Sequence, residues 1–234
     1  MKIGIIGAMS VEVEALKNCM TDAKKSVCGH LEIFEGKIYG TDCAVVQCGV
    51  GKVNAGVCAE ILIIKYNVTH IINSGVGGGL QKGLNVMDIV VSTDAVQYDV
   101  DATGFGYALC EIPGMGTVSY KADESLVRLA EAVYADGLKN GEVSHRIVAG
   151  RIGTADIFVN SREKKAEITA LCGAACCEME GAAIAQICTL NKIPFVIIRC
   201  ISDLAEDTDQ VYEEAAAAKE SIYLTENLVK RMGK

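Results

Sequence analysis

The sequence predicts an α/β fold, in which helices pack on the faces of a β-sheet. Short apolar runs rich in Val and Ile alternate with longer segments of helical periodicity along all 234 residues, and this alternation is typical of such a sheet. No Pro- or Ser-rich linker, low-complexity tract or internal repeat interrupts the pattern. One domain spanning residues 1–234 is therefore predicted. Half of the residues are hydrophobic, which is enough for a large buried core.

Strands are predicted where a short apolar run is bounded by turn residues. The first run follows Met1 directly, and the last, which begins at Phe195, is apolar apart from Arg199. In chain order, the predicted strands are Lys2–Gly7, Leu31–Ile38, Cys43–Gly49, His70–Gly75, Ile89–Val96, Arg146–Gly153, Cys176–Met179 and Phe195–Ser202.

Helices are predicted in the longer segments, where apolar residues recur at helical spacing. In chain order, they are Val11–Cys19, Val53–Tyr66, Glu124–Ala135, Glu163–Leu171, Glu180–Asn191 and Glu213–Met232. The segment Tyr98–Tyr120 has no clear periodicity and is rich in glycine and aromatic residues. A loop of this length in a compact domain usually forms a lid or a subunit contact, and we expect such a role here.

The charge balance excludes some classes of partner. The chain has 22 Lys and Arg against 30 Asp and Glu, which gives a net charge of -8. Sequence-independent binding to nucleic acid needs clustered basic residues, so we expect no nucleic-acid partner and no binding to anionic membranes. The apolar stretch Ile3–Met9 is too short for a signal peptide, and no targeting or membrane-spanning segment is visible. A cytoplasmic location is therefore expected.

The 11 cysteines do not have the pattern of a disulfide framework or a metal site. Many lie within apolar runs of a chain too large to need disulfides, so we expect reduced thiols in the core. These are Cys43, Cys48, Cys58, Cys188 and Cys200. The cluster Cys172, Cys176 and Cys177 has no second CxxC motif and no suitably spaced histidine. No zinc or other metal site is predicted.

Glycine-rich stretches lie at the ends of three of the predicted strands, at Gly4–Gly7, Gly49–Lys52 and Gly75–Gly79. Any one of these stretches can be explained by the need for a tight turn. Three of them together favour a ligand site beyond the strand ends. None has the GxGxxG pattern and acidic residue of a dinucleotide site. The second is not a P-loop either, because Val46 and Val53 replace its Gly and its Ser or Thr.

Carboxylates also follow strands, at Glu12, at Glu178 and Glu180, and at Asp203. Each alone is readily explained as a helix cap or first-turn residue. Arg199 within an apolar strand needs a partner, and Glu178, Glu180 or Asp203 can supply it. Several carboxylates around a glycine-lined pocket suit chemistry at a sugar, where one acid protonates the leaving group and one base orients water.

Taken together, these motifs resemble the 5′-methylthioadenosine/S-adenosylhomocysteine nucleosidases of the nucleoside phosphorylase superfamily. The resemblance covers essentially the whole chain. The matching segments are Met1–Met9 with Glu12, Gly49–Ala55, Ile72–Leu80, Asp88–Ser92, Asp101–Tyr107, Glu178–Ala183 and Arg199–Asp203.

The resemblance implies a single-domain α/β/α sandwich around a mixed, partly barrel-like sheet, and a homodimer. It implies hydrolysis of the adenine N-glycosidic bond of 5′-methylthioadenosine, S-adenosylhomocysteine and 5′-deoxyadenosine, without a cofactor. Within the superfamily, a purine or uridine phosphorylase or a futalosine hydrolase is the alternative. Outside it, a nucleotide-binding regulatory module without chemistry is a further alternative.

The resemblance also implies residue roles. Asp203, oriented by Ser202, protonates the purine at N7, Glu12 holds the attacking water, and Glu180 binds the ribose hydroxyls. The other implied contacts are Met179 on the sugar, Phe158 and the main chain of Val159 on adenine, Met9, Val50 and Tyr212 on the 5′ substituent, and Phe105 from the other subunit. Val76, Gly77, Glu178 and Arg199 complete the substrate-binding set. Val76 stands where many relatives carry Ser or Thr.

Hydrolysis is favoured over phosphorolysis by the distribution of cations. A phosphorylase must neutralise a phosphate dianion, normally with arginine, but no Arg precedes Arg128 and the cation nearest the glycine stretches is Lys52. Glu12 near the attacking position would repel phosphate and suits water. Because the acid must be protonated near neutral pH, we expect Asp203 to be the more apolar and Glu12 the more solvated of the pair.

Overall fold

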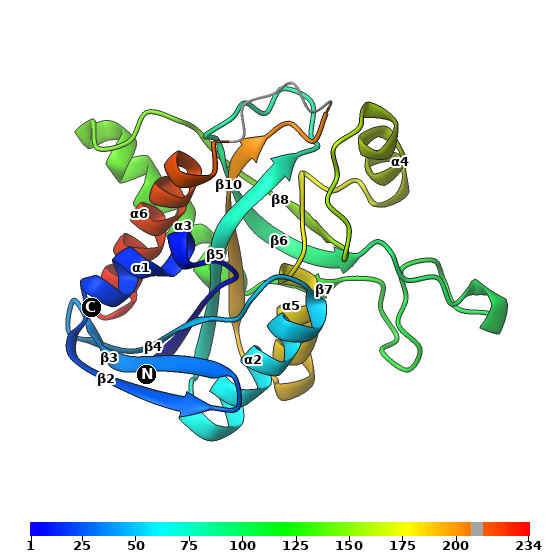
Figure 1. Ribbon diagram of the computed structural model, residues 1–234. Helices are drawn as coiled ribbons and strands as arrows, with labels where there is room; N and C mark the ends of the chain where they lie inside the picture. Colours follow the sequence, from blue (N-terminus) through cyan, green and yellow to red (C-terminus); the bar gives the residue numbers. More distant parts are fainter. Residues whose placement is uncertain (207–212) are drawn as a thin grey trace.

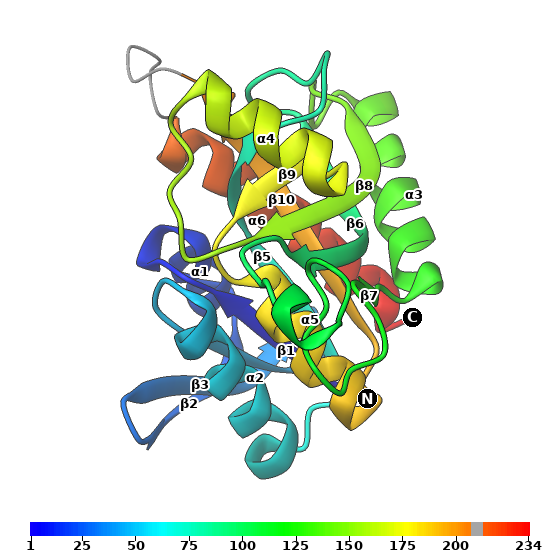
Figure 2. The same ribbon diagram turned by 90° about the vertical axis from the view of Figure 1, so that its right-hand side faces the viewer.

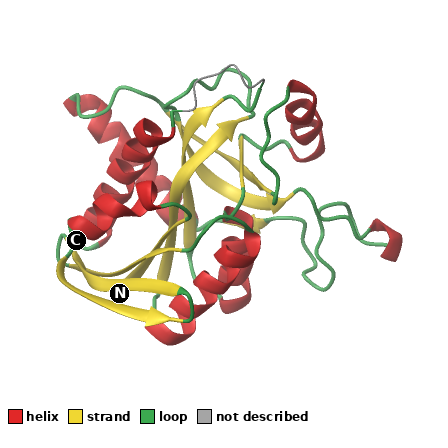
Figure 3. Cartoon of the chain, viewed as in Figure 1, coloured by secondary structure: helices red, strands yellow, loops and turns green. Residues whose placement is uncertain are grey.

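One mixed sheet runs through the molecule, with helices on both of its faces (Figures 1 and 3). The structure is a computed structural model that describes residues 1–206 and 213–234. The strands are β1 (Lys2–Gly7), β2 (Thr21–Cys28), β3 (Leu31–Ile38), β4 (Thr41–Gln47), β5 (His70–Gly79), β6 (Ile89–Gln97), β7 (Tyr120–Lys121), β8 (Ile147–Thr154), β9 (Cys176–Glu178) and β10 (Phe195–Asp203). The helices are α1 (Ser10–Asn18), α2 (Lys52–Tyr66), α3 (Glu124–Asn140), α4 (Arg162–Cys172), α5 (Gly181–Asn191) and α6 (Glu214–Met232), with a 3₁₀ turn η1 at Thr103–Phe105.

Part of the sheet closes on itself. The strand order is β10-β6-β8-β9-β5-β1-β4-β3-β2, and β10 also pairs with β5. This second pairing closes β10, β6, β8, β9 and β5 into a ring, from which β1, β4, β3 and β2 extend as an open sheet. Parallel and antiparallel pairs both occur, for example β1 with β4 and β10 with β6. The expected mixed, partly barrel-like sheet is confirmed.

The strand directions bring the predicted site residues to one edge of the sheet. β1, β4, β5 and β10 are mutually parallel, so their carboxyl ends lie side by side. β9 crosses the end of β5, with Cys177 paired to Gly78. A Cβ atom on Gly77 would lie 3.0 Å from the Cys177 carbonyl oxygen, and one on Gly78 would lie 3.1 Å from the Cys177 sulfur. Glycine therefore lets β9 approach, and β5 continues to Gly79 instead of ending at Gly75 as predicted.

The helices form two layers (Figures 1 and 2). α6 packs on β5 and β10 and is flanked by α1 and α3, whereas α2 and α5 pack on each other on the opposite side. The expected α/β/α sandwich is confirmed. No helix within the described residues is long and apolar enough to cross a membrane.

Most predicted elements are confirmed to within a few residues, and the exceptions are polar or very short. Three elements, β2, β7 and η1, were not predicted. β2 is the edge strand of the open sheet and is mostly exposed on both faces, so its sequence lacks the apolar alternation on which strand prediction depends. α3 continues to Asn140 rather than Ala135, and its Gly141 cap has φ +72°.

The segment between β6 and β7 projects from the body of the molecule and carries η1 near its tip (Figures 1 and 2). Phe105 in this segment is 87% exposed.

The cysteines predicted to fill the core, Cys43, Cys48, Cys58, Cys188 and Cys200, are all buried free thiols.

Candidate active site

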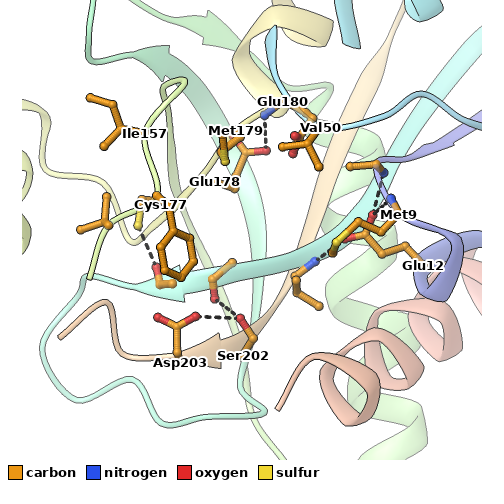
Figure 4. A pocket seen from close by; sticks show the side chains of 16 residues that line it. Met9, Glu12, Val50, Ile157, Cys177, Glu178, Met179, Glu180, Ser202 and Asp203 are labelled. Carbon is orange, nitrogen blue, oxygen red and sulfur yellow. Dashed lines mark hydrogen bonds between the residues drawn. The ribbon is translucent and has the colours of Figure 1, made fainter. Parts of the chain in front are cut away.

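A cavity of about 220 Å³ lies where β1, β5, β9 and β10 end (Figure 4). Its lining residues are Ala8, Met9, Glu12, Val50, Val76, Gly77, Gly78, Ile157, Phe158, Val159, Cys177, Glu178, Met179, Glu180, Ser202 and Asp203. Four of these carry carboxylates, and none within the described part of the chain is Lys, Arg or His. The polar side chains of the cavity are therefore four carboxylates and the Ser202 hydroxyl, and its other side chains are apolar.

Glu12 is fixed in the first turn of α1 by backbone N–H groups. Ala8 N and Met9 N donate to its Oε2 at 2.6 and 3.0 Å, and Val76 N donates to its Oε1 at 3.1 Å. A Cβ atom on Gly75 would lie 2.5 Å from Oε1, so glycine is needed there to admit the carboxylate. The hydrogen bond from Met9 N also caps α1, so Glu12 is a helix-capping residue as well as a residue of the cavity.

The expected difference in solvation between Glu12 and Asp203 is wrong. Glu12 is only 3% exposed, because α1 and β5 enclose it, whereas Asp203 is half-buried at the end of β10 and faces the cavity. Burial raises the pKa of Glu12 above its usual range, although the charge of Arg199 and the three backbone N–H groups offset part of this effect.

Asp203 is held by hydrogen bonds from Ser202, directly before it, and from Ala205, two residues after it. The Ser202 hydroxyl donates to its Oδ2 at 2.9 Å, and Ala205 N donates to its Oδ1 at 2.7 Å. Ala205 has φ +52°, and this local turn brings its N–H back to the carboxylate. The Ser202 contact is the one that the resemblance implies (Figure 4).

Glu178, which lines the cavity, forms a buried ion pair with Arg199, which does not. Arg199 Nη2 lies 2.5 Å from Glu178 Oε2, and both side chains are 2% exposed, so the prediction of a carboxylate partner for Arg199 is confirmed. Glu180 N and Gly181 N also donate to Glu178 Oε2, at 3.0 and 2.7 Å, and the Thr154 hydroxyl donates to Oε1. Glu178 thus caps α5 and pairs Arg199, and Arg199 itself does not line the cavity.

Glu180 is placed at the start of α5 and reaches the second glycine stretch. Its Oε1 accepts a hydrogen bond from Gly51 N at 2.8 Å. Burial, together with the charge of Glu178, raises the pKa of Glu180 to about 7. Gly51 has φ +100°, a conformation that favours glycine.

The raised pKa of Glu180 predicts a pH-dependent stability. Ionising this carboxyl is harder in the folded protein than in the unfolded chain, so its contribution to the free energy of folding becomes unfavourable as pH rises from 4.5 to about 7. Glu180→Gln removes that penalty. We expect urea unfolding to show that the difference in free energy of unfolding, variant minus parent, increases by about 1–3 kcal/mol from pH 4.5 to pH 8. An equal difference at both pH values would contradict the assignment.

The loop after β8 forms another part of the cavity wall. Phe158 is 64% exposed and Val159 is 5% exposed, and both line the cavity with Ile157. Met9, Val50 and Met179 line it as well. Phe105 does not line the cavity of its own chain, and Tyr212 lies outside the described residues.

Sequence reasoning missed several residues around the cavity. Ala8, Gly78 and Cys177 line it, and each is a sequence neighbour of a predicted site residue, which is the signal that could have found them. Ile157 also lines it, within the segment Asp156–Val159 that resembles the purine-binding loop of the family. No group of three or more His, Cys, Asp or Glu side chains in residues 1–206 and 213–234 is arranged to hold a metal ion.

Comparison with known proteins gives consistent results. Residues 2–232 match the phosphorylase superfamily. A 5′-methylthioadenosine/S-adenosylhomocysteine nucleosidase of Geobacillus sp. (strain WCH70) is 40% identical over 241 residues, which cover 100% of both chains. The crystal structure of such a nucleosidase from Neisseria meningitidis, in complex with methylthio-immucillin-A, has a TM-score of 0.92 and 34% identity, over 98% of this chain and 99% of that one. A futalosine hydrolase of Helicobacter pylori has a TM-score of 0.90 and 28% identity, over 99% and 98%.

Proposed function

Because the chain belongs to the 5′-methylthioadenosine/S-adenosylhomocysteine nucleosidases of the phosphorylase superfamily, we propose that it hydrolyses the N-glycosidic bond of these two nucleosides. The products are adenine and the 5′-thio-substituted ribose. One observation carries the proposal beyond the family: the cavity is lined by four carboxylates and apolar groups, without a cation among the described lining residues. This composition suits a neutral nucleoside and a water nucleophile.

The same observation disfavours a phosphorylase. Lys52, the cation nearest the glycine stretches, has its Nζ 2.6 Å from Asp99, and Arg199 is buried against Glu178. Neither is therefore available to neutralise a phosphate dianion beside the ribose. Glu12, which the resemblance places beside the attacking nucleophile, would repel such an anion.

In the proposed reaction, Asp203 delivers its proton to N7 of the purine as the bond between the ribose C1′ and N9 breaks. Adenine then leaves as a neutral molecule, and the electron pair of the broken bond goes with it. The hydrogen bonds from Ser202 and Ala205 support this role, because they fix the carboxyl at the cavity surface. The loop Ile157–Val159 supplies the apolar wall against which the purine stacks.

Glu12 accepts a proton from the water that attacks C1′ of the oxocarbenium-like sugar. A base works best when its pKa lies near the working pH, and burial moves the pKa of Glu12 in that direction. Glu180 binds the ribose hydroxyls through the carboxylate that Gly51 N orients. All of Met9, Val50, Val76 and Met179 line the cavity. In the proposed complex Met179 packs against the sugar, and Met9 and Val50 line the pocket for the 5′ substituent.

We further propose a cytoplasmic homodimer in which Phe105 enters the partner's 5′ pocket. The exposed aromatic ring on a projecting segment supports this, as do exposed apolar side chains along α2, namely Val53, Val57 and Ile64. The free thiols of all the cysteines support a reducing compartment. Sedimentation over a dilution series tests the dimer.

The decisive experiment incubates the protein with methylthioadenosine, with and without inorganic phosphate. We expect adenine and free methylthioribose to form at the same rate in both. Strict dependence on phosphate, with release of a sugar 1-phosphate, would overturn hydrolysis in favour of phosphorolysis. Because of the similarity to the Helicobacter pylori futalosine hydrolase, futalosine is run in parallel, and a higher kcat/KM for it would reassign the substrate.

A further inference from the structure

Three charged residues meet at the rim of the cavity, and none of them lines it. Lys52 begins α2, Asp99 follows β6, and Asp156 follows β8. They come from the start of one helix and from two separate loops, so any contact among them fixes these three segments relative to one another.

The contacts form a closed circuit. Lys52 Nζ donates to both carboxylate oxygens of Asp99, at 2.6 and 2.8 Å. Asp99 Oδ2 also accepts from Asp156 N at 3.2 Å, and Asp156 Oδ1 accepts from Lys52 N at 2.9 Å. We call these three residues the rim circuit. Each member contacts both others, so no member can move without straining two connections.

The rim circuit also replaces a helix cap. The N-cap residue of α2 is Gly51, which has no side chain to accept a hydrogen bond from the first turn. Asp156 supplies that acceptor from another loop. The ion pair itself is sheltered: the Lys52 and Asp99 side chains are 18% and 20% exposed, so solvent screens their attraction less than in an open surface pair.

Each segment in the circuit carries a part of the site. Gly51, next to Lys52, donates to Glu180. Asp156 is followed directly by the wall Ile157–Val159. Asp99 stands at the root of the segment that bears Phe105.

We propose that the rim circuit is a positioning device, and that Lys52 is a positioning residue which sets the distance between the purine wall and the ribose-binding Glu180. The inference rests on the proposed nucleosidase activity. The device acts on substrate binding and not on the proton transfers, because Glu12 and Asp203 have no contact with it among the described hydrogen bonds and ion pairs.

The test compares Lys52→Met, Asp99→Asn and the double variant with the parent chain. Lys37→Met is the matched control, since Lys37 pairs with Asp42 at the same 2.6 Å distance but with side chains 43% and 58% exposed on the open sheet. Two readouts are needed: kcat and KM for methylthioadenosine, and the rate of amide hydrogen exchange at residues 49–51 and 155–159.

For Lys52→Met we expect KM to rise about tenfold with kcat within about threefold, which is the signature of lost binding rather than lost chemistry. Asp99→Asn should give a smaller rise of the same kind. The double variant should be no worse than Lys52→Met, because both changes break one interaction. Lys52→Arg should restore most of the affinity. Amide exchange at residues 49–51 and 155–159 should accelerate in Lys52→Met and remain at the parent rate in Lys37→Met.

Unchanged KM and unchanged exchange in Lys52→Met would overturn the proposal, as would additive effects in the double variant or an equal rise in Lys37→Met. If Lys52→Met does not fold, Asp99→Asn carries the same readouts. If the parent chain releases no adenine, the proposed function fails, whereas the exchange rates still decide whether the circuit holds the two loops.

Discussion

Asp203→Asn is expected to lower kcat for methylthioadenosine by about 10²–10⁴-fold, the usual contribution of a general acid. The amide keeps the size of the side chain. Its single oxygen can still accept the hydrogen bond from Ala205 N, and its NH₂ group then faces the Ser202 hydroxyl, which can accept as well as donate. It has no acidic proton for N7, so adenine would have to leave as an anion. Rapid-quench measurement of adenine release gives kcat, and calorimetry gives the affinity for adenine, which we expect to change little.

Asp42→Asn serves as the control for this prediction, because Asp42 is an exposed carboxylate whose partner is Lys37. Its kcat should equal that of the parent chain. A parent-like kcat in Asp203→Asn would rule out Asp203 as the acid. A parent chain that binds adenine without turning over any nucleoside would favour the binding-module alternative instead.

Glu12→Gln is expected to lower kcat by a similar factor of about 10²–10⁴, through loss of the base that activates water. The change also has a structural cost, since Glu12 accepts three backbone N–H groups and the new amide NH₂ must face one of them. We therefore expect Glu12→Gln to lower the free energy of unfolding by about 1–3 kcal/mol. A thermal unfolding curve shows whether the variant is folded at the assay temperature.

The pH profile separates the two effects. In the parent chain, kcat should fall at acidic pH as Glu12 gains a proton, and the raised pKa of Glu12 shifts this limb toward neutral pH. The residual activity of Glu12→Gln should lack this limb. A variant that is folded and yet keeps the parent's acidic limb would exclude Glu12 as the base.

The fold class was predictable from residues because the core strands are strongly apolar. Lys2–Gly7 and Leu31–Ile38 match β1 and β3 at both ends, whereas the polar strand β2 gave no signal. The closure of the sheet depends on β10 pairing with β5 and β6 across more than 100 residues of chain. Apolar periodicity carries no information on such pairings, and only the resemblance implied the barrel-like form.

The candidate site shows the same division. Strand exits indicated Glu12, Glu178, Glu180 and Asp203, and the apolar surroundings of Arg199 correctly indicated an ion pair. The relative solvation of Glu12 and Asp203 was wrong, because it depends on how α1 packs against β5 rather than on the neighbouring residues in sequence. The rim circuit was invisible for the same reason: its members are 47 and 57 residues apart.

The closed ring of strands has a practical consequence for handling the protein. Every catalytic carboxylate proposed here sits on the ring or beside it, and the β2–β3 hairpin lies at the far end of the open sheet, beyond β4. Its turn at Gly29 has open space around it. A fluorophore or an affinity tag attached at Gly29–His30 would therefore lie away from the proposed catalytic carboxylates, whereas the same graft on the β6–β7 segment would fall on the segment that carries Phe105.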